Sequence, residues 1–335
     1  MNALRKTVCI FLCAVLAAGI LAGCGNTGSR EKPSEEEGKS IKVVATIFPI
    51  YDWTREILGA RSADADLTLL LNQGVDLHSY QPTVEDMVKI STCDLFLYVG
   101  GESDRWVSDA LANAGNTGMI AVSLLDVLGD AAREEETVEG MQEEEEEEGH
   151  EAEADEPEYD EHVWLSLRNA ALFCGVIAEK LGELDPEGAE EYAGNAADYQ
   201  KKLDELDSRY TAAVKEGRSG TLLFGDRFPF RYLTEDYGLD YYAAFSGCSA
   251  ETEASFETVI FLAGKVDALG LPAVLTLENS DGRIARTIVE NTESKNAEIL
   301  RLDSLQSTTA QAIAAGTSYL GAMEENLETL RRALG

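Results

Sequence analysis

Histidine and positive charge are both scarce in this chain of 335 residues. The sequence has three histidines, and its 27 lysines and arginines stand against 62 aspartates and glutamates, so the formal net charge is −35. A surface this negative repels phosphate, which excludes a nucleic-acid-binding protein. Hydrophobic residues nevertheless make up 44% of the chain. That fraction is enough for folded cores and argues against general disorder.

Several motifs of catalysis and cofactor binding are also missing. The sequence has no P-loop, no GxGxxG segment and no CxxC pair, and His150 does not begin an HExxH motif. Cysteine is sparse once the first 24 residues are set aside, because only Cys93, Cys174 and Cys248 follow them. These three allow at most one disulfide and require none. Each is more typical of a small buried apolar residue than of a reactive group.

Long hydrophobic runs are confined to the first residues of the chain. Arg5 and Lys6 precede an apolar stretch over 7–23, and the segment ends in LAGC at Cys24. This pattern matches a bacterial lipoprotein signal, with cleavage before Cys24 and lipid attached to that residue. An ordinary secretory signal or an N-terminal anchor helix is the alternative. We expect a signal peptide at 1–23, a flexible tether at 24–40, and a domain anchored by lipid at the cell surface or in the periplasm.

The negative charge is concentrated in one block. Residues 134–161 contain 17 aspartates and glutamates and no lysine or arginine. High charge without apolar periodicity predicts a disordered, solvated loop over 131–160. Dense carboxylates gather divalent cations weakly, and the block holds the single imidazole of His150 in its middle. We therefore expect this loop to assist a cation site elsewhere rather than to form one.

Short hydrophobic runs predict eight strands, of which residues 41–47 form a β-branched run typical of a buried strand, and helical patterns separate them. The expected strands are residues 41–47, 67–71, 94–99, 119–123, 221–224, 240–244, 273–277 and 298–302. Such alternation is typical of parallel α/β sheets. Helical spacing also continues through 186–217, and the last expected helix covers 308–334. The prediction is an α/β fold: an N-terminal lobe at 41–185, a linking helix at 186–217 and a C-terminal lobe at 218–335.

Two of the three histidines stand in loops of the N-terminal lobe. His78 follows the second expected strand in VDLHSYQPT, and His162 precedes a helix in YDEHVWLS, with Ser166 as the expected N-cap. In open α/β sheets, ligands bind at the edge where strands lead into helices. Imidazole suits zinc, manganese, iron, copper and nickel. The two loops therefore predict a transition-metal site, with satisfied structural histidines as the alternative.

These segments resemble a known family. HSYQPT, EHVWLS followed by a helix with Asn169, a long helix, FPFRYLTEDYGL and LDSL are similar to segments of the metal-binding lipoproteins of bacterial ABC importers for zinc and manganese (solute-binding protein family 9). The resemblance runs from about residue 41 to residue 335. It implies two small parallel-sheet lobes joined by one rigid helix, with the metal in the cleft between them. The acidic block occupies the place of a His- and acid-rich loop in zinc-binding members.

The resemblance also implies a set of ligands. His78 and His162 match the first two, and Asp303 of LDSL matches a family carboxylate. The third family ligand is His in zinc members and Glu in manganese members, and it stands ten residues before the Tyr of YGL. In this sequence that position is Arg227. Arginine stays protonated and cannot bind a metal, so the chain departs from the family pattern there.

Two carboxylates are candidates to replace the missing ligand. Asp226 immediately precedes Arg227, and Glu278 ends a predicted strand in TLENS. An ion pair or turn for Asp226, and structural roles for Glu278 and Asp303, are the alternatives. Two imidazoles with carboxylate oxygens suit zinc in four-coordination and manganese at higher coordination. We favour zinc because of the acidic insertion, although the missing third histidine resembles the manganese branch.

The sequence thus predicts a solute-binding lipoprotein rather than an enzyme. We expect it to be a monomer that captures zinc, or next manganese, and delivers the ion to a membrane ABC permease. A siderophore- or cobalamin-binding protein of the same architecture would not need the two loop histidines. A metal-dependent hydrolase would need an open coordination position and a general base. An adhesin or an acidic cation buffer is the third alternative, and it would bind many ions weakly.

Overall fold

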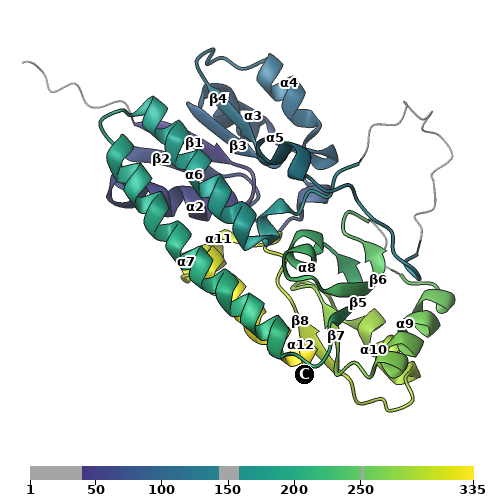
Figure 1. Cartoon of the computed structure of the whole chain (residues 1–335). Coiled ribbons are helices and arrows are strands. Elements are labelled where there is room, and N and C mark those ends of the chain that lie inside the picture. Colours follow the sequence, from purple (N-terminus) through teal and green to yellow (C-terminus); the bar gives the residue numbers. More distant parts are fainter. Residues whose placement is uncertain (1–39, 143–157, 250–252) are drawn as a thin grey trace, which may run out of the picture. The chain divides into compact units, whose positions relative to one another are not determined.

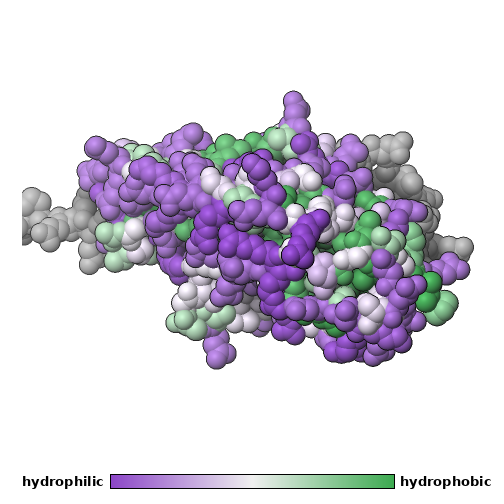
Figure 2. All heavy atoms as spheres, turned by 60° about the horizontal axis from the view of Figure 1, so that its bottom comes forward, coloured by the Kyte–Doolittle hydropathy of each residue, from purple (hydrophilic) through white to green (hydrophobic). Residues whose placement is uncertain are grey.

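The computed structural model describes residues 40–142, 158–249 and 253–335 (Figure 1). The predicted signal peptide, Cys24, almost all of the tether and His150 lie outside the described residues. Within the described residues, no helix combines the length and the apolar character needed to cross a membrane. Figure 2 shows one face of the molecule, which hydrophilic side chains cover for the most part. Hydrophobic side chains gather there in smaller patches, as the strongly negative composition leads one to expect.

The N-terminal lobe is built on a four-stranded parallel sheet in the order β2-β1-β3-β4. The strands are β1 (Ile41–Ala45), β2 (Ala65–Leu69), β3 (Leu95–Tyr98) and β4 (Ile120–Ser123). The helices are α2 (Phe48–Leu58), α3 (Val84–Thr92), α4 (Trp106–Ala112), α5 (Leu124–Leu128) and α6 (Leu167–Leu184). Central strands β1 and β3 bury Val43 and Phe96 completely, as expected for a sheet covered on both faces. The four strands predicted for this lobe are confirmed.

The C-terminal lobe repeats this plan with a sheet in the order β6-β5-β7-β8. The strands are β5 (Thr221–Phe228), β6 (Asp240–Ser246), β7 (Ala273–Thr276) and β8 (Glu298–Arg301). The helices are α8 (Arg231–Tyr237), α9 (Phe256–Leu269), α10 (Arg283–Asn291), α11 (Ala310–Ala314) and α12 (Tyr319–Leu334). Helices α9 and α10 pack against β5 and its neighbours, and α12 contacts β5, β7 and β8. Both predicted lobes and their parallel sheets are therefore present.

Helix α7 (Ala189–Glu216) connects the two lobes. It contacts α2 and α6 of the N-terminal lobe and α8 and α12 of the C-terminal lobe (Figure 1). Its 28 residues span about 42 Å at roughly 1.5 Å per residue. Seven residues on its apolar face are buried, among them Tyr199 and Tyr210. Tyr210 also donates its hydroxyl to the Met323 carbonyl at 2.6 Å. The long amphipathic helix is therefore a structural spine shared by both lobes.

Polar contacts between the lobes add to this spine. The Tyr319 N–H donates to the buried Asp52 carboxylate at 2.8 Å, and the Trp164 indole donates to the Ser304 carbonyl at 2.8 Å. The ring of Trp53 meets that of Tyr319 edge-on at 5.0 Å. Buried aromatic and polar groups that satisfy each other hold a single arrangement, because separating them would leave unpaired buried donors. The edges of the two sheets are thereby held close together.

Two expectations about loops and helices need correction. Disorder over 131–160 is wrong for the ends of that loop, because the Glu135 N–H donates to the Glu158 carbonyl at 2.8 Å and Gln142 N–H to the Ala244 carbonyl at 3.0 Å. Composition shows charge but not this backbone pairing; residues 143–157 lie outside the described part. The expected helix at 308–334 is also divided into α11 and α12. Gly316 has a φ of 104°, and Ser318 caps the new helix by accepting from Gly321 N–H.

Candidate metal centre

His78 lies in a 3₁₀ turn, Leu77–Ser79, between β2 and α3. Asp76 caps this turn by accepting the His78 N–H at 3.0 Å, which fixes the backbone of the histidine. The ring Nδ1 lies 2.8 Å from the Ser103 hydroxyl and 3.5 Å from a Glu161 carboxylate oxygen. Acceptors on the Nδ1 side favour a proton on that nitrogen. They leave the Nε2 lone pair free to bind a metal.

His162 is fixed in the same way by a different carboxylate. Asp160 Oδ1 lies 2.8 Å from the His162 backbone N and 3.0 Å from its Nδ1, so one oxygen holds both the turn and the ring. The side chain is completely buried at the N-cap of a short 3₁₀ turn, and Ser166 caps α6 four residues later by accepting from Asn169 N–H. A carboxylate behind a histidine is the arrangement that orients imidazole ligands in metal sites.

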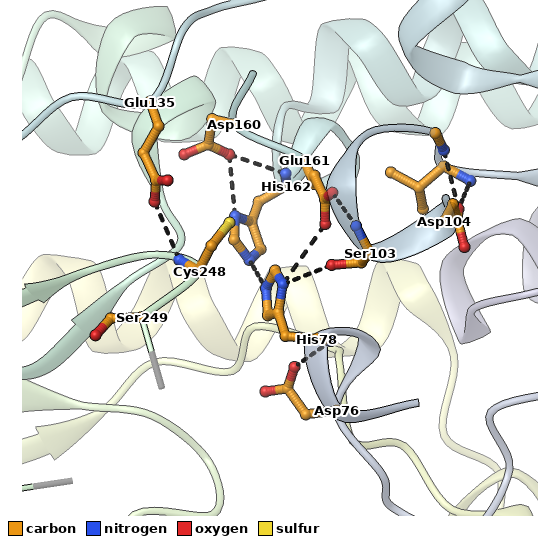
Figure 3. A network of polar contacts seen from close by, with 12 residues as sticks. Asp76, His78, Ser103, Asp104, Glu135, Asp160, Glu161, His162, Cys248 and Ser249 are labelled. Carbon is orange, nitrogen blue, oxygen red and sulfur yellow. Dashed lines mark hydrogen bonds and ion pairs between the residues drawn. The ribbon is translucent and has the colours of Figure 1, made fainter. Parts of the chain in front are cut away.

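The two rings face each other through their Nε2 atoms, which are 3.1 Å apart (Figure 3). Two lone pairs at this distance repel unless a proton or a cation lies between them. Burial, and next the charge of His162, lower the pKa of His78 to about 3. Burial also disfavours charge on His162, but the Asp160 carboxylate outweighs it and the pKa of His162 is raised. The two rings therefore differ in basicity, and both Nε2 atoms point toward a position where one metal ion could bind them.

Cys248 completes the cluster from the C-terminal lobe. It lies in the turn after β6, and its backbone N–H donates to Glu135 Oε1 at 3.1 Å. One ligand atom each from His78, His162 and Cys248 all lie within 4.8 Å of one another, and in Figure 3 the Cys248 sulfur points toward the rings. Sequence reasoning missed this residue because a lone cysteine was interpreted as apolar packing. Its position after a strand, the criterion that found His78, is the signal that could have found it.

The close approach of this turn to His162 depends on a glycine. A Cβ added to Gly247 would lie 2.9 Å from the Phe228 carbonyl oxygen and 3.0 Å from His162 Cε1. Any larger residue would push the turn away from the ring. Burial, and next the Glu135 carboxylate, raise the pKa of the neighbouring Cys248 thiol. The thiol of Cys248 is free, as are those of Cys93 and Cys174, so none of the three forms a disulfide.

Of the three carboxylates predicted as ligands, Asp226 lies near the end of β5, and Glu278 and Asp303 follow β7 and β8. None belongs to the cluster of His78, His162 and Cys248. Asp226 accepts from the backbone N–H groups of Arg227 at 2.9 Å and Leu277 at 3.3 Å. The assignment of Asp226, Glu278 and Asp303 as ligands stays a prediction.

Glu278 and Asp303 are also engaged within their own lobe. Glu278 accepts from the Ser304 N–H, from its hydroxyl and from Ser307, at 2.9 to 3.0 Å. Asp303 accepts from the Leu305 N–H at 2.8 Å. Burial, and next the Glu278 carboxylate, raise the pKa of Asp303 to about 6. These contacts tie the ends of β7 and β8 together.

Arg227 lies between the two lobes, where the family resemblance implied a ligand. Its guanidinium donates to Asp76 Oδ2 at 2.7 Å and to the Ser249 carbonyl at 3.5 Å. Asp76 caps the His78 turn, and Ser249 follows Cys248 in the chain. The side chain of Gln306, with its amide turned to satisfy both neighbours, donates to Asp76 Oδ1 at 2.9 Å and accepts from His162 Nε2 at 3.1 Å.

An acidic cavity of about 870 Å³ reaches the cluster from outside. His78 and Cys248 line it together with Glu102, Glu135 and Glu161, among others. Within the described chain, Glu161 Oε2 is buried without a hydrogen-bond partner, and burial raises the pKa of Glu161 to about 7. A cavity with this lining attracts cations toward the two histidines.

Residues 43–333 match the model of a family described as zinc-uptake complex component A, periplasmic. This chain belongs to that family. It is 31% identical over 299 residues to the zinc-binding protein AdcA of Streptococcus pyogenes serotype M6, covering 88% of this chain and 56% of that protein. It is 26% identical over 315 residues to the high-affinity zinc uptake system protein ZnuA of Bacillus subtilis, covering 94% of each. The chain thus spans little more than half the length of AdcA.

Solved structures agree with this family assignment. Zn(II)-bound AdcA from Streptococcus pneumoniae is similar with a TM-score of 0.69 and 26% identity, over 88% of this chain and 58% of that one. The metal-dependent lipoprotein YcdH from Bacillus subtilis is similar with a TM-score of 0.70 and 25% identity, over 88% of this chain and 99% of that one. The two-lobed α/β architecture is therefore that of the zinc-uptake family.

Proposed function

We propose that this protein captures a zinc ion outside the cytoplasm and delivers it to an ABC permease. The observation that carries the proposal is the pair of Nε2 atoms 3.1 Å apart, each on a ring whose Nδ1 is held by neighbouring oxygen atoms. Family membership agrees with it, since relatives are named for zinc binding and zinc uptake. No covalent bond of a substrate is made or broken in this activity, so the proposed role is that of a carrier rather than an enzyme.

We further propose that lipid on Cys24 anchors the domain to the membrane. The support is the LAGC segment after an apolar stretch, together with the name zinc-binding lipoprotein given to AdcA of Streptococcus pneumoniae, which is 29% identical over 323 residues. A Cys24→Ala variant should no longer incorporate labelled fatty acid and should leave the membrane fraction. Incorporation that persists in this variant would refute the anchor without affecting the zinc site.

The test of zinc capture is a competitive titration of the chain from residue 25 with zinc and manganese. We expect one tight zinc site, and we expect His78→Ala and His162→Ala each to abolish tight binding with little change in thermal stability. His150→Ala is the matched control, because it removes the one remaining histidine and should leave the affinity unchanged. Many weak sites, or submicromolar affinity retained in both loop variants, would contradict the proposal.

A further inference from the structure

We infer that the Cys248 thiolate is the third metal ligand, so that the site offers two imidazole nitrogens and one sulfur. This inference rests on the proposed zinc function and specifies its chemistry. The geometric basis is that ligand atoms of His78, His162 and Cys248 all lie within 4.8 Å of one another. Zinc is commonly bound by combinations of cysteine sulfur and histidine nitrogen.

The backbone around Cys248 is built to bring the sulfur to the histidines. Strand β6 continues to Ser246 and pairs there with Phe228, so the following turn projects beyond the end of β7. Gly247 lets this turn contact the His162 ring, and Glu135 holds the Cys248 N–H. Two contacts with the N-terminal lobe thereby hold the turn that presents the thiol.

The carboxylates on the same sheet edge are already committed to other donors. Glu278 receives hydrogen bonds from two serines and one backbone N–H, and Asp226 receives two backbone N–H groups. Moving either toward the histidines would leave those donors unpaired, which is unfavourable for buried groups. Cys248 is already in place and needs no such rearrangement.

Arg227 then acts as a positioning residue. Its guanidinium links Asp76, which caps the His78 turn, to the carbonyl of Ser249, which follows the ligand cysteine. It therefore holds the loops of one imidazole and of the thiolate at a fixed separation. Arg227, at the position where the family resemblance implies a ligand, therefore supports the two loops instead of binding the metal. The proposed ligand, Cys248, follows the neighbouring strand of the sheet, β6.

The acidic cavity gives the metal its route to this site. His78 and Cys248 both line it, and the carboxylates of Glu135 and Glu161 stand beside them. A hydrated ion can meet the sulfur and the first imidazole before it reaches buried His162. Sulfur is a soft donor that binds zinc well, whereas manganese prefers hard oxygen donors. The donor set therefore selects zinc against manganese.

The test uses cobalt(II) in place of zinc on the chain from residue 25. A thiolate ligand produces a sulfur-to-cobalt charge-transfer band in the near ultraviolet, and we expect that band in the wild type. Cys248→Ser should abolish the band and weaken zinc affinity more than about 100-fold, beyond the cost of losing an outer partner of a metal ligand. Cys93→Ser is the matched control, since Cys93 is a buried free cysteine outside the cluster. It should keep both the band and the affinity.

The outcomes separate this inference from the proposed function. A wild type that binds zinc tightly without the cobalt band overturns the thiolate ligand and leaves zinc capture standing. The same conclusion follows if Cys248→Ser folds and retains wild-type zinc affinity. A wild type without tight zinc binding overturns both. Because the band is measured on the wild type, poor folding of Cys248→Ser cannot imitate a positive result.

Discussion

The two sides of the metal centre differ in how their residues are held. On the N-terminal side, His78 and His162 are each backed by a carboxylate of their own lobe and direct Nε2 toward the same point. On the C-terminal side, the carboxylates at the strand ends are bonded to their own lobe, and Arg227 occupies the position where the family resemblance implied a ligand. From this comparison we expect a side chain able to bind metal to act as a ligand only where its other partners leave it free.

The largest expected difference between the two sides is in zinc affinity after substitution. His162→Ala should weaken binding more than about 100-fold, whereas Asp226→Asn, Glu278→Gln and Asp303→Asn should each change it by less than about tenfold. These amide variants keep the shape of the side chain and remove only the charge. Calorimetric or competitive zinc titration measures both effects. A loss in any carboxylate variant as large as that of His162→Ala would restore that carboxylate as a ligand.

Much of the N-terminal side could be predicted from the sequence. Short hydrophobic runs marked all eight strands, and histidine is rare enough here that two in strand-to-helix loops stand out. The orienting role of Asp160 was missed, although a carboxylate two residues before a candidate ligand could have suggested it.

The C-terminal side could not be predicted in the same way, because it depends on where strands end. Strand β5 was expected to stop at residue 224, but it continues through an irregularity at Gly225 to Phe228. A Cβ at Gly225 would lie 2.6 Å from the Ala285 backbone, so glycine serves close packing there instead of ending the strand. Strand β6 is correspondingly longer and carries Cys248 to the site. The local sequence pattern does not reveal that a strand becomes longer because it pairs with a neighbouring strand.

The pH dependence of zinc binding should depend on the protonation of proposed ligands from both lobes. Burial lowers the pKa of His78 to about 3, whereas the Asp160 carboxylate outweighs burial and raises the pKa of His162. Burial also raises the pKa of the Cys248 thiol, which must lose its proton to bind zinc, so affinity falls as pH falls, by about tenfold per pH unit for each proton displaced.

Proton release can be counted by calorimetry in buffers of different ionisation enthalpy. We expect the wild type to release about one proton more than Cys248→Ser near neutral pH. The difference of one proton is the thiol proton of Cys248, on the C-terminal side of the site. Equal release by the two proteins would show that the thiol stays protonated, and this would remove Cys248 from the ligand set.

A smaller effect on zinc affinity is expected from removing the Arg227 side chain, which links Asp76 to Ser249 between the lobes. Arg227→Ala should weaken zinc binding by about tenfold to 100-fold, the usual cost of losing a partner of a metal ligand. Arg227→Lys should recover part of the loss, because it keeps the ion pair with Asp76 but not the fork that also reaches Ser249. Arg283→Ala, which removes an exposed arginine at the start of α10, is the control. Tighter binding in Arg227→Ala would mean that the guanidinium repels the metal rather than positioning its ligands.

The smallest effect should come from the acidic block, which contributes charge near the site rather than ligands. Its described ends are fixed by backbone pairing and carry Glu135, so the sharp test replaces only residues 143–157 with a glycine-serine segment of equal length. We expect the zinc Kd to change by less than about threefold, while the association rate falls and loses part of its dependence on salt. Stopped-flow measurement at two ionic strengths separates the two quantities. A Kd weakened 100-fold would place ligands inside the acidic block. The block would then be part of the metal site and not an accessory to it.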